Sequence, residues 1–136
     1  MTDLPPSPYM TLATADADGV PWASPVWFAT EDGRDFYWVS DPNARHSRNI
    51  AARAEIAIVI FDSTVTPGEA DAVYLAARAA RVRTDGIEIF NRCGAAQGLE
   101  PWPAAKVTAP AKHRLYRATV TEAYRLGPHD ERVPLG

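Results

Sequence analysis

The sequence predicts a single domain, residues 1–136, built mainly from antiparallel β-strands that curl into a barrel, with two or three helices. Three observations favour this fold class. The chain has 136 residues, which is a usual size for one domain. Short runs of alternating apolar and polar residues recur along it. Tight-turn signals such as Asp18-Gly19 and Asp32-Gly33 separate these runs, and they predict about six strands in meander order.

The first two strand candidates are residues 9–14 and 20–30. In the second run, apolar side chains alternate between the two faces of the expected sheet. Pro21 and Pro25 lie within this run. Because proline cannot donate to a strand ladder, we expect residues 20–30 at an edge of the sheet.

A strand, a helix and a further strand follow in the middle of the chain. Residues 36–40 are the strand candidate, and Asp41-Pro42 comes directly after it. A capping carboxylate followed by proline is typical of a helix start, so we expect a helix from Asp41-Pro42 to Arg53. The β-branched run 55–61 predicts a buried strand.

The second half of the chain continues with a strand, a helix and a long final strand. Residues 73–83 predict a strand, although their alanines favour helix. Residues 85–98 predict a helix with Asp85 as its cap, and the proline-rich stretch 100–110 is expected to be irregular. Residues 113–126 alternate well. The side chains expected on one face of this last strand are Tyr116, Ala118, Val120, Tyr124 and Leu126.

Composition narrows the classes of partner. The net charge of −3 gives no electrostatic case for nucleic acid or an anionic membrane. Cys93 is the single cysteine, so no disulfide forms within the chain, as expected in a reducing cytoplasm. Residues 1–8 contain no apolar run, and we expect a soluble cytoplasmic protein with no membrane segment.

Familiar catalytic motifs are missing from the sequence. It has no phosphate-binding glycine loop, no dinucleotide fingerprint and no zinc-protease motif. His46, His113 and His129 show no metal-ligand spacing. We therefore expect no metal site and no acid–base constellation.

The segment 40–49, Ser-Asp-Pro-Asn-Ala-Arg-His-Ser-Arg-Asn, carries the clearest chemistry. A strand ends here and a helix begins, and helix starts attract anions through their free N–H groups. Guanidinium groups bind phosphate in a forked geometry. The side chains that can donate to an anion are Ser40, Arg45, His46, Ser47, Arg48 and Asn49. An anion-binding cradle is one interpretation, and an ordinary solvated first turn is the other.

Two aromatic features accompany this segment. The run Pro21-Trp22-Ala23-Ser24-Pro25-Val26-Trp27-Phe28 combines tryptophans that can flank a planar ring with prolines that leave backbone groups unpaired. Trp102 lies in a proline-rich stretch ahead of Arg114. Core or loop packing is the alternative interpretation of both.

The order of these parts resembles the pyridoxamine 5′-phosphate oxidase-like flavoproteins, the FMN-binding split-barrel superfamily. The matching pieces are residues 10–14, Asp18-Gly19 with 21–28, 36–40, 45–50 and the strand 56–61. No single piece is diagnostic, and the ordered set carries the resemblance.

The resemblance implies a six-stranded antiparallel split barrel that works as a homodimer, with FMN in clefts between the subunits. It implies that Ser24, Pro25, Val26 and Trp27 run beside the flavin ring and bind it largely through backbone atoms. Ser40 and residues 45–49 would hold the phosphate, with Arg45 or His46 at the place of a lysine usual in the oxidases. Trp102 and Arg114 would reach the ring from the partner subunit.

The chain departs from the true oxidases at its C-terminal end. It lacks their Arg-x-His pattern and ends in Arg-Val-Pro-Leu-Gly, so pyridoxamine phosphate is not the expected substrate. The leading hypothesis is an FMN-dependent oxidoreductase that acts on another small molecule. The alternatives are a deazaflavin-dependent reductase of the same fold and a non-catalytic protein that binds flavin, haem or another tetrapyrrole.

Overall fold

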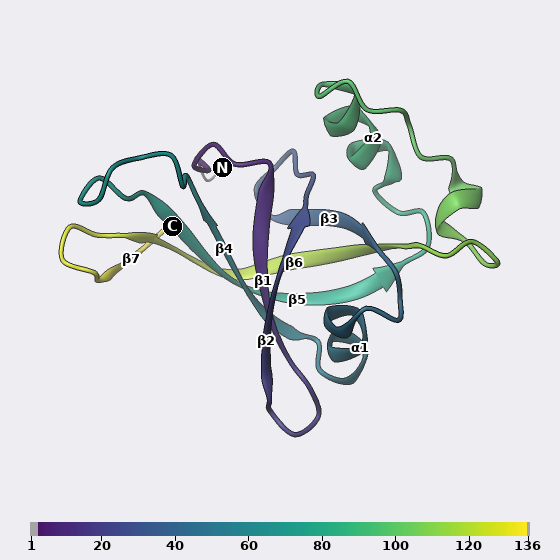
Figure 1. Cartoon of the computed structure of the whole chain (residues 1–136), viewed down its shortest axis with the longest axis horizontal. Helices are drawn as coiled ribbons and strands as arrows, with labels where there is room; N and C mark the ends of the chain where they lie inside the picture. The colour runs from purple at the N-terminus through teal and green to yellow at the C-terminus, as the bar shows by residue number, and fades with distance from the viewer. Residues whose placement is uncertain (1–2, 136) are drawn as a thin grey trace.

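A computed structural model describes residues 3–135. It shows one antiparallel sheet, two α-helices and a short 3₁₀ helix (Figure 1). The strands are β1 (Tyr9–Ala15), β2 (Pro21–Trp27), β3 (Asp35–Ser40), β4 (Glu55–Phe61), β5 (Ala72–Val82), β6 (Arg114–Leu126) and β7 (Arg132–Pro134). The helices are α1 (Arg45–Ala52), α2 (Ile87–Ala95) and the 3₁₀ helix η1 (Ala104–Val107).

The strands follow the order β2-β1-β4-β5-β6-β3, with β7 paired to β6. The predicted meander is therefore wrong at β3, which pairs with β6 and not with its sequence neighbours. The physical reason is α1, which lies between β3 and β4 in the sequence. Through α1 the chain crosses to the other side of the sheet before β4 begins (Figure 1). The strand β7 was not predicted, and it makes seven strands where six were expected.

The predicted edge position of β2 is confirmed. Within residues 3–135, β2 forms a ladder with β1 alone. Its far edge approaches β3 at one isolated bridge, in which Ala29 and Tyr37 exchange two backbone N–H···O=C hydrogen bonds of 2.9 Å each. Before Ala29 and after Tyr37 the two strands separate. The barrel is thus closed at one point and open beside it.

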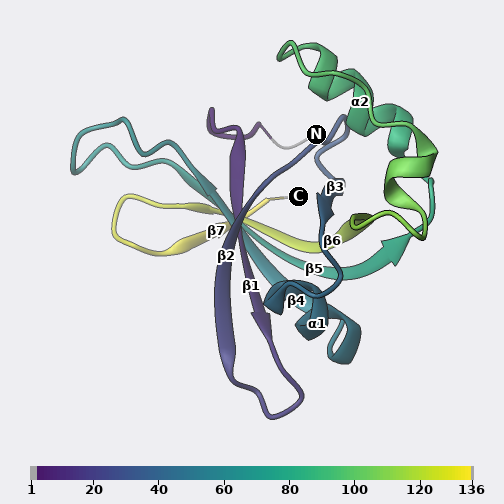
Figure 2. The same ribbon diagram turned by 45° about the vertical axis from the view of Figure 1, so that its right-hand side comes forward.

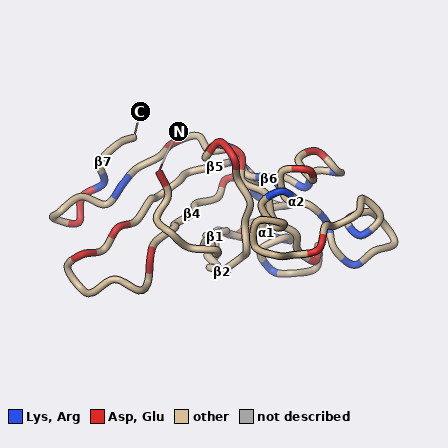
Figure 3. The backbone as a smooth tube through the Cα atoms, turned by 90° about the horizontal axis from the view of Figure 1, so that it is seen from above, with Lys and Arg blue, Asp and Glu red and all other residues tan. Residues whose placement is uncertain are grey.

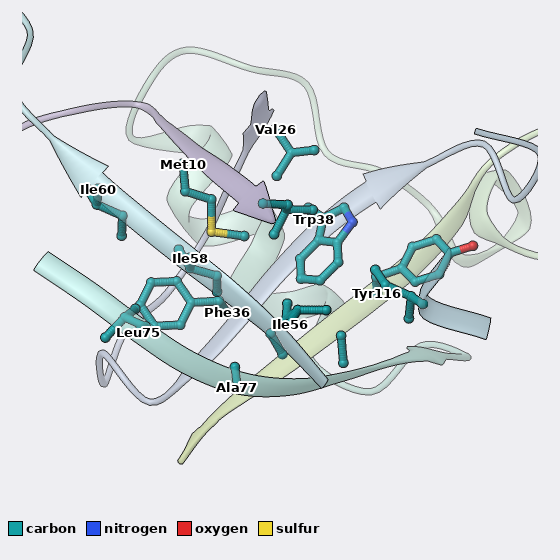
Figure 4. Packing of buried hydrophobic residues seen from close by; sticks show 14 of the residues in the cluster. Met10, Val26, Phe36, Trp38, Ile56, Ile58, Ile60, Leu75, Ala77 and Tyr116 are labelled. Carbon is teal, nitrogen blue, oxygen red and sulfur yellow. The ribbon is translucent and has the colours of Figure 1, made fainter. Parts of the chain in front are cut away.

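The barrel interior is filled by large apolar side chains (Figure 4). Phe36 and Trp38 of β3 are fully buried and face the sheet formed by β1, β4 and β5. The Trp38 ring stacks on Tyr116 of β6, with 5.8 Å between centroids. Each such side chain contributes about 1.5–3 kcal/mol through burial. The alternating burial of β1, β4 and β5 places one apolar face of each strand in this core.

Helix α1 begins later than the sequence predicts. The helix was expected from Asp41-Pro42, but it starts at Arg45, after Ala44 with no side-chain cap. The Asp41 carboxylate instead accepts the backbone N–H of Asn43 at 2.9 Å. The Ala44 N–H donates to the Asp41 carbonyl at 3.0 Å and closes a separate turn, and the Arg48 N–H donates to the Ala44 carbonyl at 3.0 Å as the first helical bond. The helix therefore starts after Ala44.

A long excursion between β5 and β6 carries α2 and η1 and stands at one side of the barrel (Figure 2). It packs on the barrel through a second apolar cluster in which Phe90 and Val107 meet Leu115 and Tyr37. The predicted cap Asp85 is wrong, because α2 follows Gly86 and has no side-chain cap. No helix among residues 3–135 has the length and apolar character needed to cross a membrane.

A β-bulge changes the predicted face of β6. Ala76 of β5 pairs with Glu122, whereas Ala77 pairs with Val120, so Thr121 is the extra residue. An extra residue reverses the alternation of side chains beyond it. Val120 and Ala123 accordingly pack against the core, and the expectation that Tyr124 and Leu126 share the face of Ala118 is wrong.

Gly86 generates a stability prediction. Its φ is +87°, and an added Cβ would lie 2.1 Å from the buried Tyr37 ring. We expect Gly86→Ala to lower the free energy of unfolding by about 2–4 kcal/mol, from backbone strain and overpacking together. Urea denaturation measures this free energy of unfolding. Gly68→Ala is the control, because Gly68 has φ +91° and open space around its Cβ position; it should cost about 1–2 kcal/mol. Equal losses in the two variants would contradict the close approach of Gly86 to Tyr37.

Candidate functional site

A cleft of about 650 Å³ opens where β2 and β3 separate. Before Ala29 on β2 and after Tyr37 on β3, residues of both strands face the cleft and do not pair with each other. The excursion that carries α2 supplies the opposite wall. The lining residues are Pro8, Tyr9, Pro25, Val26, Trp27, Val39, Ser40, His46, Phe90, Asn91, Gly94, Gln97, Leu99, Glu100, Trp102 and His113.

The edge of β2 offers backbone groups to this cleft. Ala29 directs its N–H and C=O toward β3, and backbone groups point to the same edge at every second residue of a strand. Trp27 and Pro25 follow that period and line the cleft. The Pro25 nitrogen carries no hydrogen. The open edge therefore leaves no backbone N–H unpaired at that position.

Aromatic rings form the walls of the cleft. Trp27 of β2 meets Phe90 of α2 edge to face, with 5.1 Å between centroids. Phe90 meets Trp102 at 6.5 Å, and Trp102 meets His113 at 5.6 Å, both again edge to face. Rings fixed in this way provide flat apolar surfaces of the kind that a planar ligand contacts.

Side-chain hydrogen bonds hold the second wall in place. Asn91 donates from Nδ2 to the carbonyl of Trp102 at 3.0 Å and accepts the N–H of Trp102 at 2.8 Å. Trp27 Nε1 donates to Gln97 at 3.1 Å. The Arg92 guanidinium binds both carboxylate oxygens of Glu31 at 2.8 Å. These contacts tie α2 and Trp102 to each other and to β2.

Ser40 and His46 form the polar end of the cleft. His46 Nε2 lies 2.9 Å from Ser40 Oγ, and both side chains are buried. Burial lowers the pKa of His46 below its usual range, because charge is disfavoured away from water. His46 is therefore neutral near pH 7. Among residues 3–135, no group of three or more His, Cys, Asp or Glu side chains is placed to hold a metal ion.

Arg45 is the first residue of α1 and directly precedes His46 in the chain, but it does not line the cleft. Its guanidinium sits 4.2 Å from the ring centroid of Trp22, an exposed residue of β2. A cation held over an aromatic face keeps most of its N–H donors free. Arg45 is thus an exposed cationic side chain with donors to spare, next to His46 in the sequence.

The other predicted site residues lie outside the cleft. Ser47 and Arg48 line a separate hollow on the opposite side of α1. Asn49 is buried and donates to Thr14 Oγ1 at 3.0 Å, which anchors α1 to β1. Arg114 donates to the carbonyls of Ala111 and His113. Ser24 and Arg45 do not line the cleft either. Contact with a cofactor stays a prediction for every residue of the predicted set.

The structure brings together Pro25, Val26, Trp27, Ser40, His46 and Trp102 of the predicted set. Trp102 lines the cleft of its own chain, whereas the resemblance implied a contact from a partner subunit. Sequence reasoning missed the contribution of α2. Phe90, Gly94 and Gln97 recur at i, i+4 and i+7, and this helical spacing was the signal that could have placed them on one face.

The fold is similar to that of several solved structures. HutZ, a heme storage protein from Vibrio cholerae, matches with a TM-score of 0.69 and 20% identity, over 86% of this chain and 84% of its own. A heme binding protein from Mycobacterium smegmatis matches with a TM-score of 0.68 and 25% identity, over 95% of this chain and 52% of its own. An F420 reductase matches with a TM-score of 0.62 and 22% identity, over 85% and 87%.

None of the curated protein sequences compared with this chain matches it. One family model, described as pyridoxamine 5′-phosphate oxidase, matches residues 2–127. That match spans nearly the whole chain and confirms the resemblance carried by the ordered sequence pieces. The chain belongs to the pyridoxamine 5′-phosphate oxidase family.

Proposed function

We propose that this protein binds FMN in the cleft beside β2 and acts as a flavin-dependent oxidoreductase on a small molecule. The observation that carries the proposal is the separation of β2 from β3. It leaves the backbone of Pro25 and Trp27 facing a cleft with aromatic walls and a polar end. The cleft volume of about 650 Å³ lies within the range of small-molecule sites, roughly 300–1,000 Å³.

The donors at the polar end suit a phosphate. The Ser40 hydroxyl and a His46 nitrogen lie side by side there. Arg45, the residue before His46, would add a permanent charge by turning its side chain from Trp22 toward the phosphate. A phosphate would bring negative charge to His46 and favour its protonated form. In this arrangement the phosphate end and the aromatic end of one ligand are held by different parts of the cleft.

The proposed reaction needs no acid–base pair from the protein. When bound, a flavin supplies the hydride chemistry itself. The chain's residues would fix the ring between Trp27 and Trp102, hold the phosphate, and keep water out of the aromatic end.

We further propose that the active form is a homodimer. Tyr9 and Leu99 line the rim of the cleft, yet they are 55% and 51% exposed. Large exposed apolar side chains beside a binding site are typical of a surface that a partner covers. A second copy placed over this rim would enclose the ligand.

Haem is the second candidate ligand. His46 and His113 both line the cleft, and a neutral imidazole is a usual haem ligand. The similarity to the Mycobacterium smegmatis heme binding protein also supports this candidate. A deazaflavin with a long anionic tail fits less well, since the charged residue that lines the cleft, Glu100, is acidic.

The first test is a titration of the purified protein with FMN, riboflavin and hemin. We expect FMN to bind with a Kd of about 1 μM or tighter, which corresponds to about −8 kcal/mol. Riboflavin should bind at least about tenfold more weakly, because it lacks the phosphate that Arg45 and His46 would bind. Flavin fluorescence and absorption measure the Kd of FMN and of riboflavin. Haem would be supported instead if the protein does not bind FMN, forms a haem absorption band with hemin, and loses that band in the His113→Ala variant.

A second test compares two arginines of α1, Arg45 and Arg48, that make different contacts. The Arg45 guanidinium sits over Trp22, whereas Arg48 lines the other hollow. We expect Arg45→Gln to weaken FMN binding about tenfold or more, and Arg48→Gln to change it less than about twofold. Both substitutions remove one exposed charge, so net charge is matched. Equal losses of FMN affinity in the two variants would show that the phosphate responds to the charge of α1 as a whole and is not held at the cleft.

The pH dependence of FMN binding tests His46. Burial lowers the pKa of His46 in the free protein, and a bound phosphate raises it, so binding takes up a proton. FMN affinity should therefore increase as the pH falls from 7.5 to 6.5, by at most about tenfold per pH unit. Riboflavin affinity should stay flat, and His46→Gln should flatten the FMN profile. A flat wild-type profile that His46→Gln leaves unchanged would remove His46 from the phosphate site.

A further inference from the structure

A second hollow, with a volume of about 700 Å³, lies between α1 and the end of β5. The two elements are side by side in both views (Figures 1 and 2). Alanines leave this space open, because their side chains end at Cβ on both facing elements: Ala51 and Ala52 on α1, Ala79 and Ala80 on β5.

The polar groups of the hollow are all hydrogen-bond donors to an anion. Arg48 and Arg81 line it, and none of its lining residues is acidic. Arg48 uses one N–H to bind the Asn43 carbonyl at 3.0 Å, which leaves the others free. Arg81 forms no ion pair with any residue between 3 and 135. Acidic and basic residues are interspersed over the chain (Figure 3), so this local excess of positive charge is a property of the hollow.

Ser47 provides an independent observation. It is 3% exposed and lines the hollow, and its hydroxyl has no hydrogen-bond partner among the described residues. A buried hydroxyl without a partner is destabilising by roughly 1–3 kcal/mol, and folded proteins rarely keep one without a reason. The hydroxyl oxygen is itself enclosed, so the Ser47 side chain rotates toward the hollow when an acceptor there satisfies it.

We propose that this hollow is a second ligand site, separate from the cleft, for a small organic anion with a flat apolar body. Arg48 and Arg81 bind its phosphate or carboxylate group, with the forked geometry that guanidinium offers to both anions. The Ser47 hydroxyl donates to the same group. Pro42, the alanines and the buried Tyr116 ring contact the apolar body.

The test uses phenyl phosphate and benzoate as probes, with backbone amide NMR shifts as the readout. We expect saturable shifts at Ser47, Ala51 and Arg81, with and without added FMN. The better of the two probes identifies the anionic group as phosphate or carboxylate. Arg81→Gln should weaken binding of the better probe about tenfold and leave FMN affinity unchanged.

Arg83→Gln is the matched control. It removes the same charge two residues further along, and Arg83 does not line the hollow. Its probe affinity should stay within about twofold of the wild type. Equal losses in Arg81→Gln and Arg83→Gln would reduce the effect to general charge attraction and overturn the proposal. Competition between FMN and the probes, or no saturable shift with either probe, would also overturn it.

Ser47→Ala separates the ligand role of the hydroxyl from a structural role. It removes a buried group that lacks a partner, so the empty protein should gain about 2–5 °C in its unfolding midpoint. Its probe affinity should fall several-fold. A loss of thermal stability would show that the hydroxyl has a partner within the fold, and the proposal would lose its independent support.

Discussion

The isolated bridge between Ala29 and Tyr37 is the constraint on which the rest of the structure depends. Its two hydrogen bonds fix β3 relative to β2 at one point, and below that point the strands part to form the cleft. The Tyr37 ring also packs against Gly86, where the excursion that carries α2 begins. One residue therefore sets the closure of the barrel, the width of the cleft and the position of its second wall.

Helix α1 presents different chemistry on its two sides. His46 faces the cleft, while the next residue, Ser47, faces the hollow beside β5. Neighbouring residues on a helix are about 100° apart, so the rotation of α1 about its axis decides which side chain meets which space. The buried hydrogen bond from Asn49 to Thr14 fixes that rotation. This hydrogen bond therefore influences both the cleft and the hollow beside β5, although Asn49 lines neither of them.

Local sequence patterns were sufficient for most strands and for the position of the polar segment. Alternation identified β2 and β6, the β-branched run identified β4, and the prolines placed β2 at an edge without knowledge of the topology. The failures have a common origin in longer-range contacts. The extra residue Thr121 is invisible until β6 is paired with β5. Likewise, the separation of Ser47 and Arg48 from His46 depends on the elements that flank α1.

The prolines of β2 have a further consequence. An unpaired strand edge is a template on which another chain can add a strand, and such edges promote aggregation. Pro21 and Pro25 lie at every fourth position of the edge that faces away from β1, and they interrupt the row of N–H donors that an added strand requires. The edge thus keeps carbonyl groups available inside the cleft while it resists extension of the sheet by a second polypeptide.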